Sequence, residues 1–138
     1  MKFLKTAMIF VFVLFSFSAL AADPIQDLID VTVPVNATGG EPTLEEVKIA
    51  ILAGCRARGW SPSISADGKI VANILVRSKF FAEVEISYTK KTYSIVYKSS
   101  RELDYDEGKR KIHRNYNKWV GMLSASIQRA FGVRAQGF

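Results

Sequence analysis

The chain has 138 residues and a formal net charge of +6, and 49% of its residues are hydrophobic. This length suits one ordinary domain, long enough to bury about two-thirds of the surface of its unfolded chain. Because Cys55 is the single cysteine, an internal disulfide is excluded, and the domain must be stabilised by its core alone.

The first segment, residues 1–21, has the three parts of a secretory signal peptide. Two lysines precede an apolar block over residues 6–17, and small residues around Ala21 form a cleavage site. The block is shorter than the roughly 20 apolar residues of a membrane-spanning helix. We expect cleavage after Ala21, with Ala22 as the alternative. Since no cysteine follows this site, the sequence predicts a periplasmic protein with no lipid anchor and no transmembrane segment in the mature chain.

The positive charge has a particular meaning for an exported protein. In the cytoplasm it would raise nucleic acid as a partner, whereas in the envelope the available anions are lipid headgroups, lipopolysaccharide and other polymers, so we expect no nucleic acid. The densest basic cluster lies late in the chain: Lys109, Arg110, Lys111, Arg114 and Lys118. This basic cluster is a candidate contact for an anionic envelope component, although a run of charge is usually a solvated face.

Residues 22–42 form a leader into the domain. Apolar and polar residues alternate over residues 29–35, which predicts a short strand, and Pro34 confines that strand to a sheet edge. Residues 43–46 are a capping box that starts a helix, and Gly59 is placed to end it. One face of this helix carries an apolar stripe: Leu44, Val47, Ile51 and Cys55.

Four strands follow, joined by short turns. The first, over residues 61–66, is weak, and Asp67-Gly68 is a strong hairpin signal. Further turns are expected near Ser78-Lys79 and over residues 89–91. Alternate residues of the strands share one apolar face, which we expect the helices to cover: Ile70, Ile74, Val84, Ile86, Ile95 and Tyr97.

The chain then becomes polar and irregular over residues 99–110. A final helix is expected to start between Ile112 and Asn115 and to stop at Gly132, with Trp119 largely buried. The sequence thus predicts an α+β fold, an antiparallel four- to five-stranded meander sheet with two helices packed on one face. Residues 43–132 form this single domain, and residues 133–138 form a C-terminal tail.

Several segments, in this order and spacing, resemble a group of small exported or lipoprotein-like proteobacterial proteins of unknown function. The segments are Arg58-Gly59-Trp60, residues 82–88, residues 93–100, Leu103-Asp104-Tyr105 and residues 111–119. The resemblance covers nearly all of the mature chain. It implies an exported single domain and implies no activity or site.

His113 is the only histidine, so any imidazole catalysis must use it. Hydroxyl and acidic residues precede it, as a Ser–His–Asp device would need: Ser99, Ser100, Glu102, Asp104 and Asp106. However, the sequence has no Gly-x-Ser-x-Gly elbow and no recognisable oxyanion-hole turn. We therefore interpret His113 as a residue that fixes the start of the last helix, with its ring bonded to backbone.

We expect no metal and no cofactor. One histidine and one cysteine on different elements cannot supply the ligands of a zinc site without carboxylates. The acidic residues 102–107 lack the calcium-loop pattern. Glu83 and Glu85 lie on one strand and are expected to pair with Arg77 on the neighbouring strand rather than to form a catalytic pair.

The second face of the sheet carries large apolar residues from three strands, with Arg77 among the polar residues around them: Val71, Leu75, Phe81 and Val96. They could merge into one contact patch, which either another part of the chain covers or a second copy or another envelope protein contacts. We therefore expect a non-catalytic periplasmic binding or accessory protein. The alternatives are a small periplasmic hydrolase that uses His113 and a periplasmic inhibitor or stress-protective protein.

Overall fold

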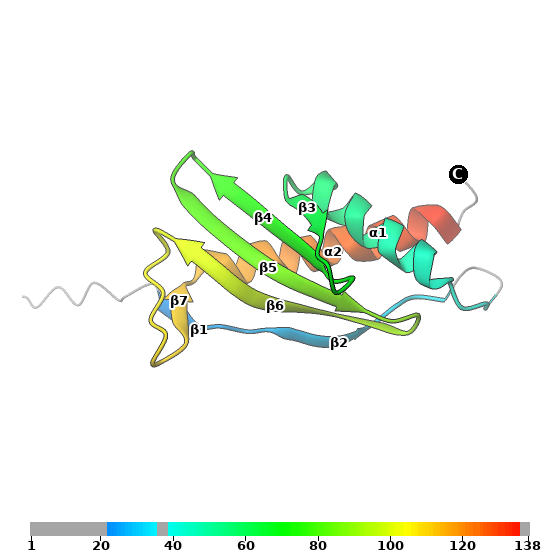
Figure 1. Cartoon of the computed structure of the whole chain (residues 1–138), viewed down its shortest axis with the longest axis horizontal. Coiled ribbons are helices and arrows are strands. Elements are labelled where there is room, and N and C mark those ends of the chain that lie inside the picture. The colour runs from blue at the N-terminus through cyan, green and yellow to red at the C-terminus, as the bar shows by residue number, and fades with distance from the viewer. Residues whose placement is uncertain (1–21, 36–38, 136–138) are drawn as a thin grey trace, which may run out of the picture.

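A computed structural model describes residues 22–35 and 39–135 of the chain (Figure 1). The expected signal peptide and its cleavage after Ala21 therefore concern residues outside the described ones. The elements in chain order are β1 (Ala22–Pro24), β2 (Leu28–Thr32), α1 (Leu44–Ala57), β3 (Ser61–Ile64), β4 (Ile70–Val76), β5 (Phe80–Tyr88), β6 (Thr92–Arg101), β7 (Lys111–His113) and α2 (Asn115–Ala135).

The fold is α+β, and the predicted fold class is confirmed. Five antiparallel strands form the main sheet in the order β2-β6-β5-β4-β3, so β3 to β6 make a meander and β2 is added beside β6. The two helices contact each other and lie together on one side of the sheet (Figure 1). A separate two-stranded sheet pairs β1 with β7 and brings the start of the described chain next to the start of α2.

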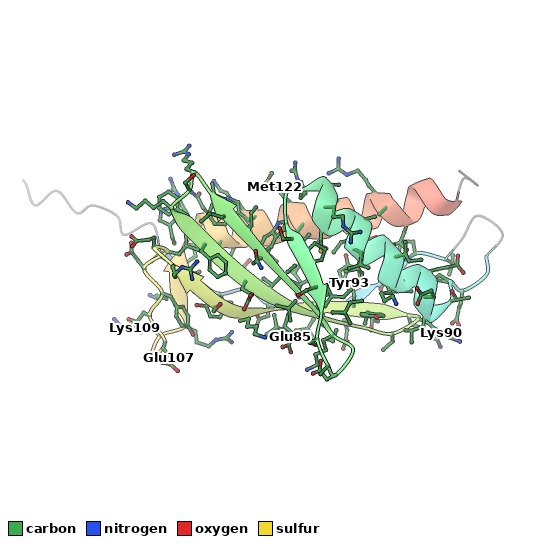
Figure 2. All side chains as sticks on the ribbon, turned by 45° about the horizontal axis from the view of Figure 1, so that its top comes forward. Glu85, Lys90, Tyr93, Glu107, Lys109 and Met122 are labelled. Atoms are coloured by element: carbon green, nitrogen blue, oxygen red, sulfur yellow. The ribbon has the colours of Figure 1, made fainter. Side chains whose placement is uncertain are left out.

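Side chains alternate across the sheet as the sequence pattern predicts. Tyr93 of β6 points toward the helices, whereas Glu85 of β5 points away from them (Figure 2). The inward residues of the central strands are buried: Ile70, Ala72, Ala82, Val84, Ile86, Tyr93 and Ile95. Ile74 and Tyr97 are only partly buried and pack against this core.

Helix α1 begins where the capping box places it. The Thr43 hydroxyl accepts a hydrogen bond from the Glu46 N–H, and the Glu46 carboxylate accepts one from the Thr43 N–H, both at 3.1 Å. The buried face of α1 includes Val47, Ile51 and Cys55, but Leu44 in the first turn is 48% exposed and does not belong to the core. The expected stripe therefore starts one turn later than predicted.

Close contact between the two helices depends on Gly54 of α1. A Cβ atom at this position would lie 2.6 Å from the Ile127 Cα atom of α2. Real side chains do not approach a backbone atom this closely. The absence of a side chain at Gly54 therefore sets how near α2 lies to α1.

Three local predictions are wrong. Strand β6 continues to Arg101, and β7 forms within the segment expected to lead into the helix. Helix α2 runs through Gly132 to Ala135, since a glycine inside a helix costs only about 1 kcal/mol and does not end it by itself. Trp60 is 3% exposed, but Trp119, which we expected to be largely buried, is only partly buried because it lines a cavity.

Candidate functional site

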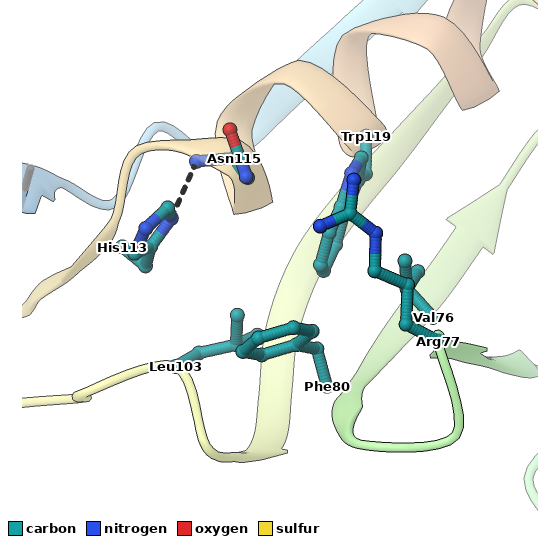
Figure 3. A pocket seen from close by; sticks show the side chains of 7 residues that line it. All are labelled: Val76, Arg77, Phe80, Leu103, His113, Asn115 and Trp119. Carbon is teal, nitrogen blue, oxygen red and sulfur yellow. Dashed lines mark hydrogen bonds between the residues drawn. The ribbon is translucent and has the colours of Figure 1, made fainter.

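A cavity of about 260 Å³ lies between the β4–β5 hairpin, the loop after β6 and the start of α2 (Figure 3). It is lined by Val76, Arg77, Phe80, Leu103, His113, Asn115 and Trp119. Figure 3 shows Phe80 and Leu103 on one side of this space, opposite His113 and Asn115, with Arg77 beside Trp119. We call this space the His113 cavity.

The backbone that builds the His113 cavity is unusual at several positions. Leu103 is 2% exposed and lies between Glu102 and Asp104, which have left-handed φ angles of 61° and 52°. Its carbonyl accepts a hydrogen bond of 2.9 Å from the His113 N–H. Left-handed conformations cost non-glycine residues roughly 1–2 kcal/mol each, and such residues cluster at functional sites.

The hairpin side of the cavity is also built on left-handed residues. Arg77 and Ser78 have φ angles of 54° and 56°, and the Lys79 N–H closes the turn on the Val76 carbonyl at 3.1 Å. Two consecutive left-handed residues define the turn that matches the right-handed twist of paired strands. Consequently, Arg77 leaves the strand and reaches the cavity on the helix side of the sheet.

This position of Arg77 corrects the predicted ion pairs on the outer face. Arg77 pairs with neither Glu83 nor Glu85. Glu85 instead contacts the ammonium groups of Lys69 and Lys98, at 3.0 and 3.9 Å. The prediction placed Arg77 within the strand, whereas β4 ends at Val76.

The His113 ring is held by the backbone of α2. Its Nδ1 atom accepts a hydrogen bond of 3.2 Å from the Asn115 N–H (Figure 3). A ring nitrogen that accepts carries no proton, so the neutral imidazole has its proton on Nε2. Among the described residues, no carboxylate or hydroxyl is hydrogen-bonded to the ring, so the acidic and hydroxyl residues that precede it in the sequence do not form a triad with it.

A second cavity, of about 110 Å³, adjoins the first. Arg58, Trp60, Ile74, Val76, Trp119 and Met122 line it. Val76 and Trp119 belong to both linings, so these two side chains stand between the two cavities. Each cavity also has one arginine, Arg77 in the first and Arg58 in the second.

The outer face of the sheet does not carry one continuous apolar patch. Cross-strand pairing arranges its residues in three rows: Val71–Glu85–Val96, Asn73–Glu83–Ser99 and Leu75–Phe81–Arg101. The polar middle row separates the two apolar pairs. In the last row the Arg101 guanidinium lies 4.1 Å from the centre of the Phe81 ring.

Residues 29–35 do not cover this face. Strand β2 pairs with β6 at the edge of the sheet instead, and Leu75 is 57% exposed. Isolated exposed apolar residues of this kind are common on protein surfaces. The outer face therefore remains a candidate contact surface, but its apolar residues are separated by polar ones.

The basic cluster is exposed and spans three elements. Lys109 and Arg110 lie in the turn before β7, where Figure 2 shows Lys109 close to Glu107, and the other members lie in or after β7. Arg110 donates to the Asp27 carboxylate at 3.0 Å, and this bond raises the pKa of Arg110. Among the described residues, the other four cations form no ion pair.

Two further observations concern metal and thiol chemistry. In residues 22–35 and 39–135, no group of three or more His, Cys, Asp or Glu side chains is arranged to hold a metal ion. Cys55 is fully buried in α1, and burial raises the pKa of its thiol to about 12. A thiol in this state is a small hydrophobic residue rather than a nucleophile.

Comparisons with protein-family models, with curated proteins and with solved structures found no match to this chain. The described helices include none that is long and apolar enough to cross a membrane.

The sequence singled out Arg77 and His113 separately, for different roles, and the structure brings both to one cavity. It proposed no site role for the other five lining residues. Of these five, Asn115 could have been identified from the sequence, because it lies two residues after the only histidine, where the last helix was expected to start.

Proposed function

We propose that this protein is a non-catalytic binding protein of the bacterial envelope and that the His113 cavity is its ligand site. The observation that carries the proposal is the composition of the cavity lining. Four apolar side chains line it together with three polar ones, Arg77, His113 and Asn115. This combination is typical of small-molecule sites, in which apolar surface supplies affinity and a few polar groups orient the ligand.

The hydrogen bonding of His113 favours binding over hydrolysis. Nδ1 is occupied by the Asn115 N–H, and Nε2 carries the proton of the neutral ring, so the imidazole has no free lone pair to act as a general base. A hydrolase also needs a nucleophile and an orienting carboxylate bonded to the ring, and the described residues supply neither.

The envelope location rests on the signal-peptide pattern of residues 1–21. The pairing of β1 is compatible with the processing that we propose. Ala22 pairs with His113 in the two-stranded sheet, so cleavage after Ala21 leaves all three residues of β1 in the mature chain. Cleavage after Ala22 would remove one of them.

The ligand site is tested by nuclear magnetic resonance on protein that is expressed as the full chain and purified after export. Probes are indole, 2-naphthoate and 2-naphthamide, titrated to about 5 mM, since weak ligands have millimolar dissociation constants. We expect saturable shifts at the Trp119 indole N–H and the Asn115 side-chain amide. If none of these probes shifts either signal, the proposal is wrong.

Two neighbouring phenylalanines supply a matched pair of variants. Phe80 lines the cavity, whereas Phe81 lies on the outer face beside Arg101. We expect Phe80→Ala to weaken binding about tenfold, since it removes most of one wall, and Phe81→Ala to change it less than about twofold. Equal effects of the two substitutions would place the site elsewhere.

A further inference from the structure

The polar groups around the His113 cavity are mainly hydrogen-bond donors. The Arg77 guanidinium has five N–H groups and no acceptor, and the His113 ring has its proton on Nε2 because Nδ1 accepts from the Asn115 N–H. The Asn115 amide adds two further N–H groups and one carbonyl oxygen, which is the one side-chain oxygen in the lining. No aspartate or glutamate lines the cavity. A ligand that satisfies this lining must therefore present acceptors.

The one charged side chain in the lining of the cavity, Arg77, is positive. Within the described part of the chain, Arg77 forms no ion pair, although the structure has six other ion pairs among its described residues. The first turn of α2, where Asn115 lies, has no acidic residue. The positive end of the helix dipole is thus not neutralised by an acidic side chain of its own first turn, which favours a negatively charged group near Arg77 and Asn115.

The other walls of the cavity are apolar, so a ligand that fills the cavity needs an apolar portion that contacts them. Phe80, Leu103 and Trp119 contribute ring and aliphatic surface (Figure 3). The cavity holds about 260 Å³, whereas an apolar cavity of about 150 Å³ is enough for benzene. One or two aromatic rings with a carboxylate fit this space, and an inorganic anion would leave the apolar walls without a partner.

We infer that the ligand is a small organic acid, an aryl carboxylate or a carboxylate of similar size. Its carboxylate lies between Arg77 and His113, and its apolar body lies against Phe80 and Leu103. This inference rests on the proposed function, because it names the ligand class of the same cavity. Arg77 is the residue that selects an acid over a neutral analogue.

The test compares 2-naphthoate with 2-naphthamide, which have the same rings and differ in charge, and adds inorganic phosphate as an anion without an apolar body. Affinities are measured by calorimetry on the exported protein. We expect 2-naphthoate to bind at least about tenfold more tightly than 2-naphthamide, as a charge-assisted contact allows. Phosphate is expected to bind more weakly than 2-naphthoate by a similar factor.

Two arginine substitutions assign the selectivity to one residue. Arg77→Gln removes the charge at the cavity, and Arg101→Gln removes the same charge from the outer face. We expect Arg77→Gln to reduce the preference for the acid below about threefold, and Arg101→Gln to leave it unchanged. Thermal unfolding of both variants confirms that each is folded.

The outcomes separate the two proposals. If 2-naphthamide or phosphate binds the wild-type protein as tightly as 2-naphthoate does, the ligand class is wrong while the cavity remains a binding site. Retention of the acid preference in Arg77→Gln also overturns the inference. If indole binds and neither naphthalene compound does, the ligand class is wrong; if none of the three compounds binds, the proposed function itself fails.

Discussion

The Nδ1 atom of His113 accepts a hydrogen bond from the main-chain N–H of Asn115, two residues further along the chain, at 3.2 Å. This bond satisfies one of the N–H groups that the first turn of a helix leaves without a partner. A side chain just before α2 thus performs the role of a helix cap, and the same residue lines the cavity.

His113→Leu is expected to destabilise the protein by about 1 kcal/mol relative to His113→Asn, the cost of an absent helix cap. The asparagine carboxamide oxygen stands close to the position of Nδ1 and retains an acceptor for the Asn115 N–H, whereas leucine has none. Urea denaturation of both variants measures the difference. Equal free energies of unfolding would mean that the bond does not stabilise the start of α2.

Glycine-to-alanine substitutions at two helical positions should have opposite effects. Gly54→Ala places a methyl group 2.6 Å from the Ile127 Cα atom, so the helices must separate, and we expect a loss of about 1–3 kcal/mol. At Gly121 of α2 a Cβ meets no atom within 4 Å, and Gly121→Ala should stabilise by up to about 1 kcal/mol. Thermal unfolding measures both. A stable Gly54→Ala variant would contradict the close approach of the helices.

Tyr93 links the sheet to α2 through its hydroxyl. Its Oη lies 2.7 Å from the Ser124 Oγ atom and accepts from the Gln128 amide at 2.9 Å. Tyr93→Phe removes the β6 partner of the Ser124 hydroxyl, whereas Gln128 keeps its hydrogen bond of 3.3 Å to the Thr32 carbonyl of β2, and we expect a loss of about 1–2 kcal/mol. Tyr88→Phe is the control, because the Tyr88 hydroxyl forms no hydrogen bond with the described residues. A similar loss in both variants would show that the network does not stabilise the fold.

Stability should fall at alkaline pH because of Cys55. Burial raises the pKa of its thiol from 9.0 to about 12. Above pH 9 the unfolded chain loses this proton while the folded protein keeps it, so the folded state binds more protons and stability decreases as pH rises. The decrease approaches about 1.4 kcal/mol per pH unit up to the folded pKa.

Cys55→Ala isolates this effect from those of other titrating groups. The variant lacks the thiol, so its stability disadvantage relative to the wild type should shrink as pH rises from 9 toward the folded pKa of about 12. Urea denaturation across this range measures the difference. A difference that is constant with pH would mean that the thiol ionises equally in both states.

Leu75→Glu should leave the free energy of unfolding within about 0.5 kcal/mol of the wild-type value, the range of ordinary surface substitutions. Leu75 is 57% exposed in the row that ends at Arg101. Urea denaturation and sedimentation are measured together. Loss of folding would place this face in the core, and loss of self-association with folding intact would identify it as an interface between copies.

Local patterns in the sequence determined much of the architecture. The capping box at Thr43, the hairpin signal at Asp67-Gly68 and the alternation along the strands each depend on residues within a few positions of one another. Such features form whenever backbone preference and burial agree. They were sufficient for the fold class, the start of α1 and the buried face of the sheet.

The tertiary structure alone decided how distant segments combine. The pairing of β2 with β6, the pairing of β1 with β7 and the position of Arg77 outside its strand leave no periodic signal. The His113 cavity likewise joins residues 76–80 of a hairpin, Leu103 of a loop and residues 113–119 at the start of a helix. The chemistry of the cavity depends on which side chains these distant segments bring together. A sequence specifies these tertiary contacts only through the packing of the whole domain, because contacts between distant segments leave no local sequence pattern.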